Sequence, residues 1–162
     1  MFSRRYCILD IEAVGLCQEK LEPGHFSKHH FCRRKTALRT YTGVELVLDG
    51  NPCIPEEALK QKDRKSFQFC QEKIHHLSYQ PKRPYFECRQ IAKQVWRFLE
   101  VHNIEIVFHK GGDLERDLCY EIGIECMDLA RFGISKYPEK WHDPLEEIRF
   151  FYHSMVWKRD LW

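Results

Sequence analysis

The sequence of 162 residues has no long apolar run and no large excess of charge of either sign. Lysine and arginine number 26 against 24 acidic residues, which argues against a protein that binds nucleic acid by net charge alone. No signal-peptide core or lipidation motif follows Met1, so an intracellular protein, cytoplasmic or nuclear and away from membranes, is expected. The length predicts a single domain over residues 1–162, in a chain that could continue beyond Trp162.

The eight cysteines include no Cys-x-x-Cys pair, and their spacing matches no ordinary zinc finger. Without a secretion signal, reduced thiols or metal ligands are expected rather than a disulfide framework. Two sets of residues could still hold a structural Zn²⁺, although an exposed strand or loop explains the first set better and ordinary burial explains the cysteines of the second better. The sets are His29, His30 and Cys32 with a fourth ligand from elsewhere, and Cys119, Cys126, His142 and His153.

Two carboxylates stand one residue apart near the start of the chain. An apolar run beginning at Tyr6 leads into Asp10-Ile11-Glu12, and a small-residue turn with Gly15 follows. On a strand, alternation puts Asp10 and Glu12 on one face, where like charges repel unless a cation neutralises them. Mg²⁺ or Mn²⁺ is the hard divalent cation that such pairs hold in enzymes that cleave phosphodiesters. A solvated strand end is the alternative interpretation.

The remaining pattern predicts an α/β protein with a mixed sheet flanked by helices. Three antiparallel strands come first, then a helix, a strand, a helix, a parallel strand and a terminal helix that begins at Pro144 with Asp143 as its N-cap. This is the element order of the ribonuclease-H-like fold. After the first strand, the predicted strands are 36–41, 44–48, 104–108 and 126–129, with a turn at 42–43; the earlier helices are 86–99 and 113–122, the second ending at Gly123.

Three short motifs carry acidic residues at matching places in that fold. They are Asp10-Ile11-Glu12, His109-Lys110-Gly111-Gly112-Asp113-Leu114-Glu115 and His142-Asp143-Pro144-Leu145-Glu146-Glu147. The sequence here resembles the 3′–5′ exonucleases of the DEDDh group, whose motifs are Asp-x-Glu, His-Asn-x-x-Phe-Asp and His-x-Ala-x-x-Asp. The resemblance spans nearly the whole chain and implies one ribonuclease-H-like exonuclease domain.

The chain departs from that pattern at several positions. Lys110 replaces the usual asparagine, and Glu147 replaces the final aspartate, although glutamate can bind the same metals. The acid of the second motif could be Asp113 or Glu115, and Glu115 is preferred because Arg116 and the helix residues follow it much as in the family. The second and third motifs also lie close together in sequence, as if one helix of the family had been lost.

The resemblance implies hydrolysis of single-stranded RNA or DNA from the 3′ end by a two-metal mechanism. Two Mg²⁺ or Mn²⁺ ions are expected on Asp10, Glu12, Glu115 and Glu147, with His142 as the general base. Nucleic acid would contact Lys110 and wedge against apolar residues at the end of the first strand. The expected contacts are Ala13, Val14 and Leu16, with His75, His76 and Tyr79 further along the path of the strand.

A catalytically inactive member of the same fold is the main alternative. In it the carboxylates would be relics, and the domain would bind RNA or a protein partner with a structural zinc. A third hypothesis is a protein-interaction domain that uses exposed aromatic residues such as Trp157 and Trp162.

Overall fold

The computed structural model describes residues 4–14, 33–50, 64–65, 68–74 and 88–160. Several sequence predictions therefore fall outside the described residues. They concern Leu16, His29, His30, Cys32, His75, His76, Tyr79 and Trp162.

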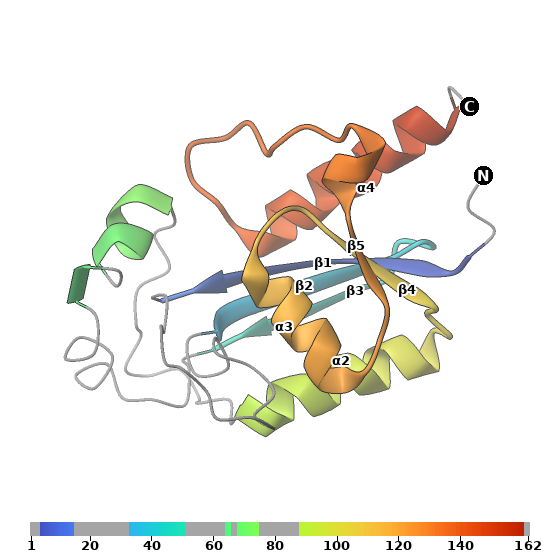
Figure 1. Cartoon of the computed structure of the whole chain (residues 1–162), viewed down its shortest axis with the longest axis horizontal. Coiled ribbons are helices and arrows are strands. Elements are labelled where there is room, and N and C mark those ends of the chain that lie inside the picture. The colour runs from blue at the N-terminus through green and yellow to red at the C-terminus, as the bar shows by residue number, and fades with distance from the viewer. Residues whose placement is uncertain (1–3, 15–32, 51–63, 66–67, 75–87, 161–162) are drawn as a thin grey trace.

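One five-stranded sheet forms the centre of the fold, in the order β3-β2-β1-β4-β5 (Figure 1). The first three strands are antiparallel, and β4 and β5 run parallel to β1. This mixed arrangement confirms the ribonuclease-H-like fold that the element order predicted. The strands are β1 (Tyr6–Ala13), β2 (Arg33–Thr40), β3 (Glu45–Asp49), β4 (Ile106–His109) and β5 (Cys126–Asp128).

The strand β2 begins three residues earlier than predicted. Alternation of apolar residues did not indicate a strand at Arg33 and Arg34, but both side chains are buried. Arg33 pairs with Glu121 at 3.0 Å, and Arg34 pairs with Asp49. These tertiary ion pairs allow cationic side chains to occupy buried strand positions, which local sequence cannot indicate. The predicted turn between β2 and β3 is confirmed, with Gly43 at a φ of +89°.

Three α-helices flank the sheet: α2 (Cys88–Val101), α3 (Asp113–Ile122) and α4 (Pro144–Asp160). Gly123 ends α3 in the left-handed conformation, as predicted. Asp143 caps α4 as predicted, since its Oδ1 accepts a hydrogen bond of 3.0 Å from the backbone N–H of Leu145. Two short helical segments, η1 (Cys70–Ile74) and η2 (Leu129–Phe132), were not predicted.

Other predicted strand boundaries are wrong by one or two residues, and at two of them another hydrogen bond holds the chain. The backbone N–H of Ile104 donates to the carbonyl of Leu99 and closes the end of α2, so β4 begins only at Ile106. The strand β5 ends at Asp128, whose side chain accepts from the backbone N–H of Ala130 and starts η2. Leu129 therefore belongs to η2.

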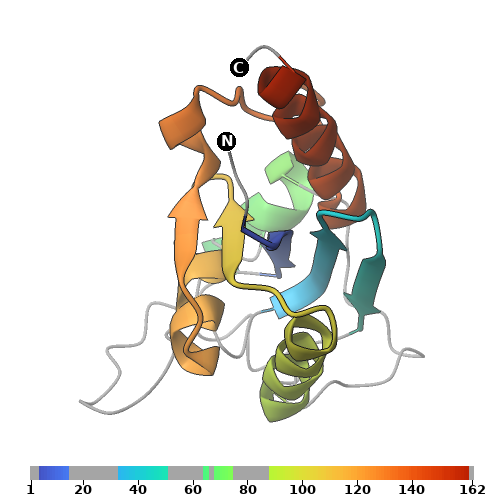
Figure 2. The same ribbon diagram turned by 90° about the vertical axis from the view of Figure 1, so that its right-hand side faces the viewer.

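The helices lie on opposite faces of the sheet (Figure 2). Alternation along β1 sends Tyr6 and Ile8 into a core beneath α4, while Cys7, Leu9 and Ile11 enter the core formed with α2 and α3. Asp10 shares the α4 face with Ile8. The apolar residues of β1 thus pack against helices on both faces of the sheet. Its acidic residues lie at the end of the strand, on the face that α4 covers.

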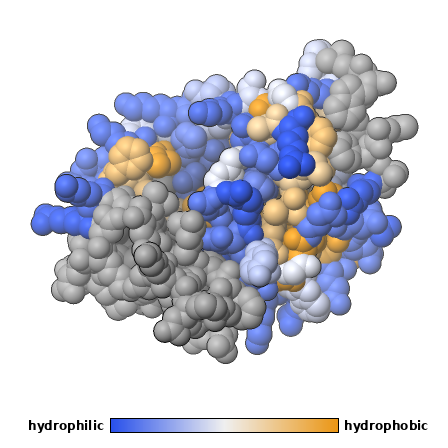
Figure 3. Space-filling model, viewed as in Figure 1, coloured by the Kyte–Doolittle hydropathy of each residue, from blue (hydrophilic) through white to orange (hydrophobic). Residues whose placement is uncertain are grey.

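Apolar and polar side chains are mixed on the surface that Figure 3 shows, where an apolar strip runs over β5 and the segment after it. None of the helices among the described residues has the length and hydropathy needed to cross a lipid bilayer.

Candidate metal centre

Asp10 and Glu12 occupy the last part of β1 on one face, as alternation predicted. Asp10 is buried, and its Oδ2 makes no hydrogen bond with the described residues. Glu12 is half-buried, and the pairing of β1 with β2 becomes irregular between Glu12 and Ala13. This face of β1 is covered by α4, so both carboxylates meet side chains from the beginning of that helix.

Glu115 reaches the same place from the first turn of α3. The strand β1 continues beyond its last paired residue with β4, Ile8, so the backbone of Ile11 has no neighbouring strand on that side. Glu115 takes that place, with its Oε1 accepting a hydrogen bond of 2.9 Å from the N–H of Ile11. Gly112 leaves the space for this carboxylate, since a Cβ there would lie 2.9 Å from Oε2 of Glu115.

Asp113, the alternative acid of the second motif, points elsewhere. Its carboxylate pairs with Arg116 on the surface, and its side chain is 45% exposed. Glu115 is only 4% exposed and lies beside the β1 carboxylates. The structure therefore brings Glu115, and not Asp113, into the cluster.

The beginning of α4 supplies Glu147 and His142. The backbone N–H of Glu147 donates to the carbonyl of Asp143 in the first turn, and its side chain is buried against β1. Oε1 of Glu147 lies 2.8 Å from Nδ1 of His142, while its Oε2 has no hydrogen-bond partner among the described residues. His142 Nδ1 also lies 4.0 Å from Oε1 of Glu12, and its backbone N–H donates to the carbonyl of Ile74 in η1.

Burial and mutual repulsion raise the pKa of three carboxyl groups in the cluster. Desolvation is the largest cause that raises the pKa of Asp10 and of Glu12, and the charge of Glu147 is the next. Desolvation also raises the pKa of Glu115 to about 8. Asp10, Glu12 and Glu115 therefore keep their protons more readily than ordinary carboxyl groups, and a cation in the cluster would favour their ionised forms.

The donor set fits a hard divalent cation. Carboxylate oxygens are the ligands that Mg²⁺ and Mn²⁺ prefer, and Asp10 and Glu147 each direct a buried oxygen without a hydrogen-bond partner into the cluster. Ligand atoms of Glu12, His142 and Glu147 lie within 4.8 Å of one another. Asp10, Glu12, Glu115 and Glu147 could therefore hold metal, with His142 at the edge of the site.

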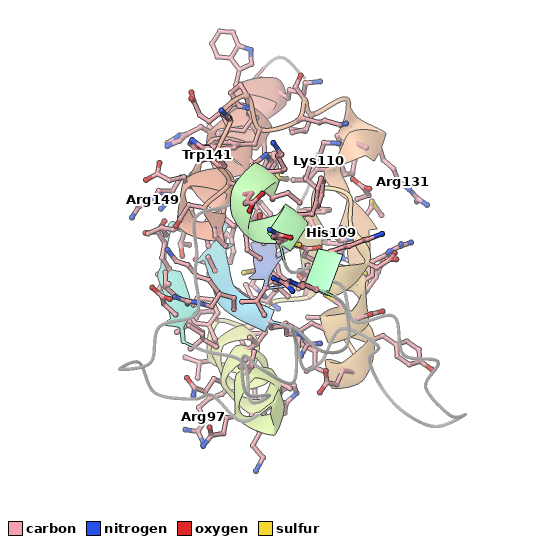
Figure 4. The ribbon with its side chains drawn as sticks, turned by 90° about the vertical axis from the view of Figure 1, so that its left-hand side faces the viewer. Arg97, His109, Lys110, Arg131, Trp141 and Arg149 are labelled. Carbon is pink, nitrogen blue, oxygen red and sulfur yellow. The ribbon has the colours of Figure 1, made fainter. Side chains whose placement is uncertain are left out.

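The cluster opens into a cavity of about 460 Å³. Lys110, predicted as a nucleic-acid contact, lies in its lining and follows β4 at the end of the molecule that Figure 4 shows. Lys136 and Tyr137 were not predicted from the sequence as site residues. They lie in a loop, where no periodic pattern in the sequence indicates which way a side chain points. The lining residues are Asp10, Ile11, Glu12, Lys110, Gly111, Gly112, Leu114, Glu115, Lys136, Tyr137, His142, Glu147 and Phe151.

Other predicted site residues lie apart from this cavity. Ala13 and Val14 are buried at the end of β1 and do not line it. The four candidate zinc ligands of the C-terminal third do not converge in the described structure. Cys126 contacts Cys119 and His109, whereas His142 belongs to the carboxylate cluster. Trp157 is exposed on α4.

Comparison with known proteins adds little to what the sheet order and the side chains show. No protein-family model and no curated protein matches the chain. Among solved structures, the chain is similar to a family B DNA polymerase from the hyperthermophilic archaeon Pyrobaculum calidifontis, with 12% identity and a TM-score of 0.34. The similarity covers 75% of this chain and only 12% of the polymerase chain. Sheet order and side chains themselves define a ribonuclease-H-like protein with an acidic cluster at one end of its sheet.

Proposed function

We propose that the protein is a metal-dependent 3′–5′ exonuclease of the DEDDh type that acts on single-stranded RNA or DNA. The observation that carries the proposal is the convergence of four carboxylates from three elements beside one histidine. Asp10 and Glu12 come from β1, Glu115 from α3 and Glu147 from α4. The preference for a 3′ end and for single strands rests on the resemblance of the three sequence motifs.

The four carboxylates would hold two Mg²⁺ or Mn²⁺ ions. When bound, such ions activate the attacking water and stabilise the leaving 3′ oxygen. Backbone hydrogen bonds position two of these carboxylates. The hydrogen bond from Ile11 fixes one oxygen of Glu115, and the first turn of α4 holds Glu147 against β1.

His142 is the proposed general base. Since the carboxylate of Glu147 accepts a hydrogen bond, Nδ1 of His142 is the donor in this 2.8 Å contact. In the neutral ring, this tautomer makes Nε2 the nitrogen that can take a proton from water. The side chain of His142 is 34% exposed, so the proton can pass on to solvent.

The test is digestion of 5′-labelled single-stranded RNA and DNA in Mg²⁺, Mn²⁺ or EDTA. Stepwise shortening in metal that EDTA stops is expected, because removal of nucleotides from the 3′ end leaves the label on a ladder of products. A 3′-phosphorylated substrate distinguishes attack at the free 3′ end from internal cleavage. The double variant Asp10→Asn/Glu12→Gln keeps the shapes of both side chains, and it should lose at least a thousandfold in rate.

Glu125→Gln is the matched control, because this carboxylate is exposed and pairs only with Arg4 in the contacts described for it. It should cleave as the unmodified protein does. Equal activity of the double variant and the unmodified protein would rule out the proposed centre. Metal-independent binding of RNA without cleavage would instead support the inactive binding module.

A further inference from the structure

Two lysines stand in the same cavity as the four carboxylates. Lys110 belongs to the turn after β4, and Lys136 belongs to the loop between η2 and α4, so they come from different walls. Among the described residues, neither ammonium group forms an ion pair with a carboxylate. Lys35 differs, since its ammonium already lies 2.6 Å from the carboxylate of Asp143.

The charges of the cavity indicate what the two lysines can bind. Two divalent cations would balance the four carboxylates, so the lysines would supply the remaining positive charge, although the nearby carboxylate of Asp128 also interacts with the charge of Lys110. A phosphodiester carries one negative charge, whereas a phosphate monoester has a second pKa of about 6 and carries nearly two at pH 7.5. Lysine binds phosphate oxygens as a concentrated point charge. Two lysines therefore match the dianion better than the monoanion.

An aromatic ring lies beside these cations. Tyr137 lines the cavity, and its ring centre is 5.7 Å from that of His142 at an interplanar angle of 71°. Phe150 contacts the same ring edge to face at 5.6 Å. These two neighbours fix the ring of Tyr137, and aromatic rings in such positions stack on nucleobases of any sequence.

We propose that Lys110, Lys136 and Tyr137 form a subsite that selects a nucleoside 5′-monophosphate over the corresponding phosphodiester. This inference rests on the proposed function, since a nucleoside 5′-monophosphate is what hydrolysis from the 3′ end releases. Lys110 and Lys136 hold the terminal phosphate dianion, and Tyr137 contacts the base. Product is consequently retained after cleavage and competes with the next strand.

The experiment measures binding of three ligands by isothermal titration calorimetry in Mn²⁺ at pH 7.5. The ligands are adenosine 5′-monophosphate, its methyl phosphodiester and adenosine. The unmodified protein should bind the monophosphate about tenfold more tightly than the methyl diester. Lys110→Met and Lys136→Met should each remove most of that preference, while Lys136→Arg should retain it because the charge is kept.

Tyr137→Leu should weaken the monophosphate and adenosine by a similar factor, about tenfold, because both contain the base. Lys140→Met is the matched control, since this ammonium lies 4.9 Å from the centre of the Trp141 ring and is not part of the cavity lining. It should bind all three ligands as the unmodified protein does. Thermal unfolding of each variant confirms that it is folded.

Equal affinity of the unmodified protein for monophosphate and diester would overturn the subsite, as would no binding of either. Retention of the full preference by both lysine variants would also overturn it. The digestion assay separates this outcome from failure of the proposed function. Metal-dependent cleavage with no monophosphate preference disproves only the subsite, whereas selective monophosphate binding without cleavage disproves only the nuclease.

Discussion

The backbone N–H of Ile11 donates a hydrogen bond of 2.9 Å to Oε1 of Glu115. This contact joins two motifs that lie 104 positions apart in the chain. The pairing of β1 with β4 ends at Ile8, so this hydrogen bond supplies a partner for the N–H of Ile11. It also fixes the position of the Glu115 carboxylate in the candidate metal centre. The end of the sheet and the acidic cluster are therefore parts of one arrangement, and disturbing Glu115 should affect both.

Gly112→Ala should lower both stability and metal affinity. The backbone of Gly112 has φ 73° and ψ 148°, a conformation that residues with a side chain rarely adopt, and the added Cβ would lie 2.9 Å from Oε2 of Glu115. We expect a loss of about 2 kcal/mol in the free energy of unfolding and weaker Mn²⁺ binding by calorimetry. Gly111→Ala is the control for backbone strain, since Gly111 also has a positive φ of 64° but its added Cβ meets nothing within 4 Å; it should lose stability and keep its Mn²⁺ affinity. Undiminished Mn²⁺ affinity in Gly112→Ala would contradict this account.

Metal should stabilise the protein more at pH 8 than at pH 5. A carboxyl group whose pKa is raised by folding favours the folded state while protonated, so stability falls as pH rises from its unfolded pKa to its folded one. For Glu115 this range runs from 4.5 to about 8. Protein in EDTA should lose thermal stability across that range, and Mn²⁺ should restore it at the alkaline end.

The double variant Asp10→Asn/Glu12→Gln serves as the control for this measurement. It removes two of the repelling charges, so its melting temperature in EDTA should fall less with pH and should respond less to Mn²⁺. The same Mn²⁺-induced rise in melting temperature at pH 5 and pH 8 would show that these carboxylates do not bind the ion.

Glu121→Gln should destabilise the fold by about 3 kcal/mol, because it removes the carboxylate that pairs with the buried guanidinium of Arg33. The side chains of Arg33 and Glu121 are 0% and 10% exposed, and their charged groups are 3.0 Å apart. Urea unfolding measures the loss. Glu125→Gln, which removes an exposed ion pair with Arg4, should change stability little. Equal effects of the two variants would mean that burial does not decide the contribution of Glu121.

Cys126 should react with iodoacetamide in the folded protein near neutral pH. Contact with Cys119 lowers the pKa of the half-buried Cys126 thiol to about 6, with a smaller contribution from His109. The alkylation rate, followed by mass spectrometry of the peptide, should rise from pH 5 and level off above pH 7. Cys119→Ala should move this rise to higher pH. Buried Cys7 should stay unmodified, and a Cys126 rate that still increases steeply above pH 8 would contradict the lowered pKa.

Much of the fold follows from local patterns in the sequence. The β-branched residues and alternation of β1, the turn at Gly43 and the cap at Asp143 depend on neighbours within a few residues. Period-two alternation also placed Asp10 and Glu12 on one face. Such features can be predicted because the backbone periodicity and local hydrogen bonds that produce them are short in range.

The boundary of β2 could not be predicted in this way, since the buried guanidinium of Arg33 pairs with Glu121, which reaches it from α3. The motif favoured Glu115 over Asp113, but the physical reason is that the N–H of Ile11 has no partner strand and donates to Glu115 instead. Lys136 and Tyr137 line the cavity from an irregular loop, and no periodic pattern in the sequence predicts the path of such a loop.

The order of elements and the pair of acidic residues on β1 follow from the sequence alone, because both depend on local backbone geometry. The other groups of the site come together through the packing of the folded chain. Glu115 and Glu147 approach β1 from opposite helical layers, and the cavity lysines come from two separate loops. Their meeting depends on how helices pack at the end of a sheet whose strands differ in length, and that is a property of the folded chain.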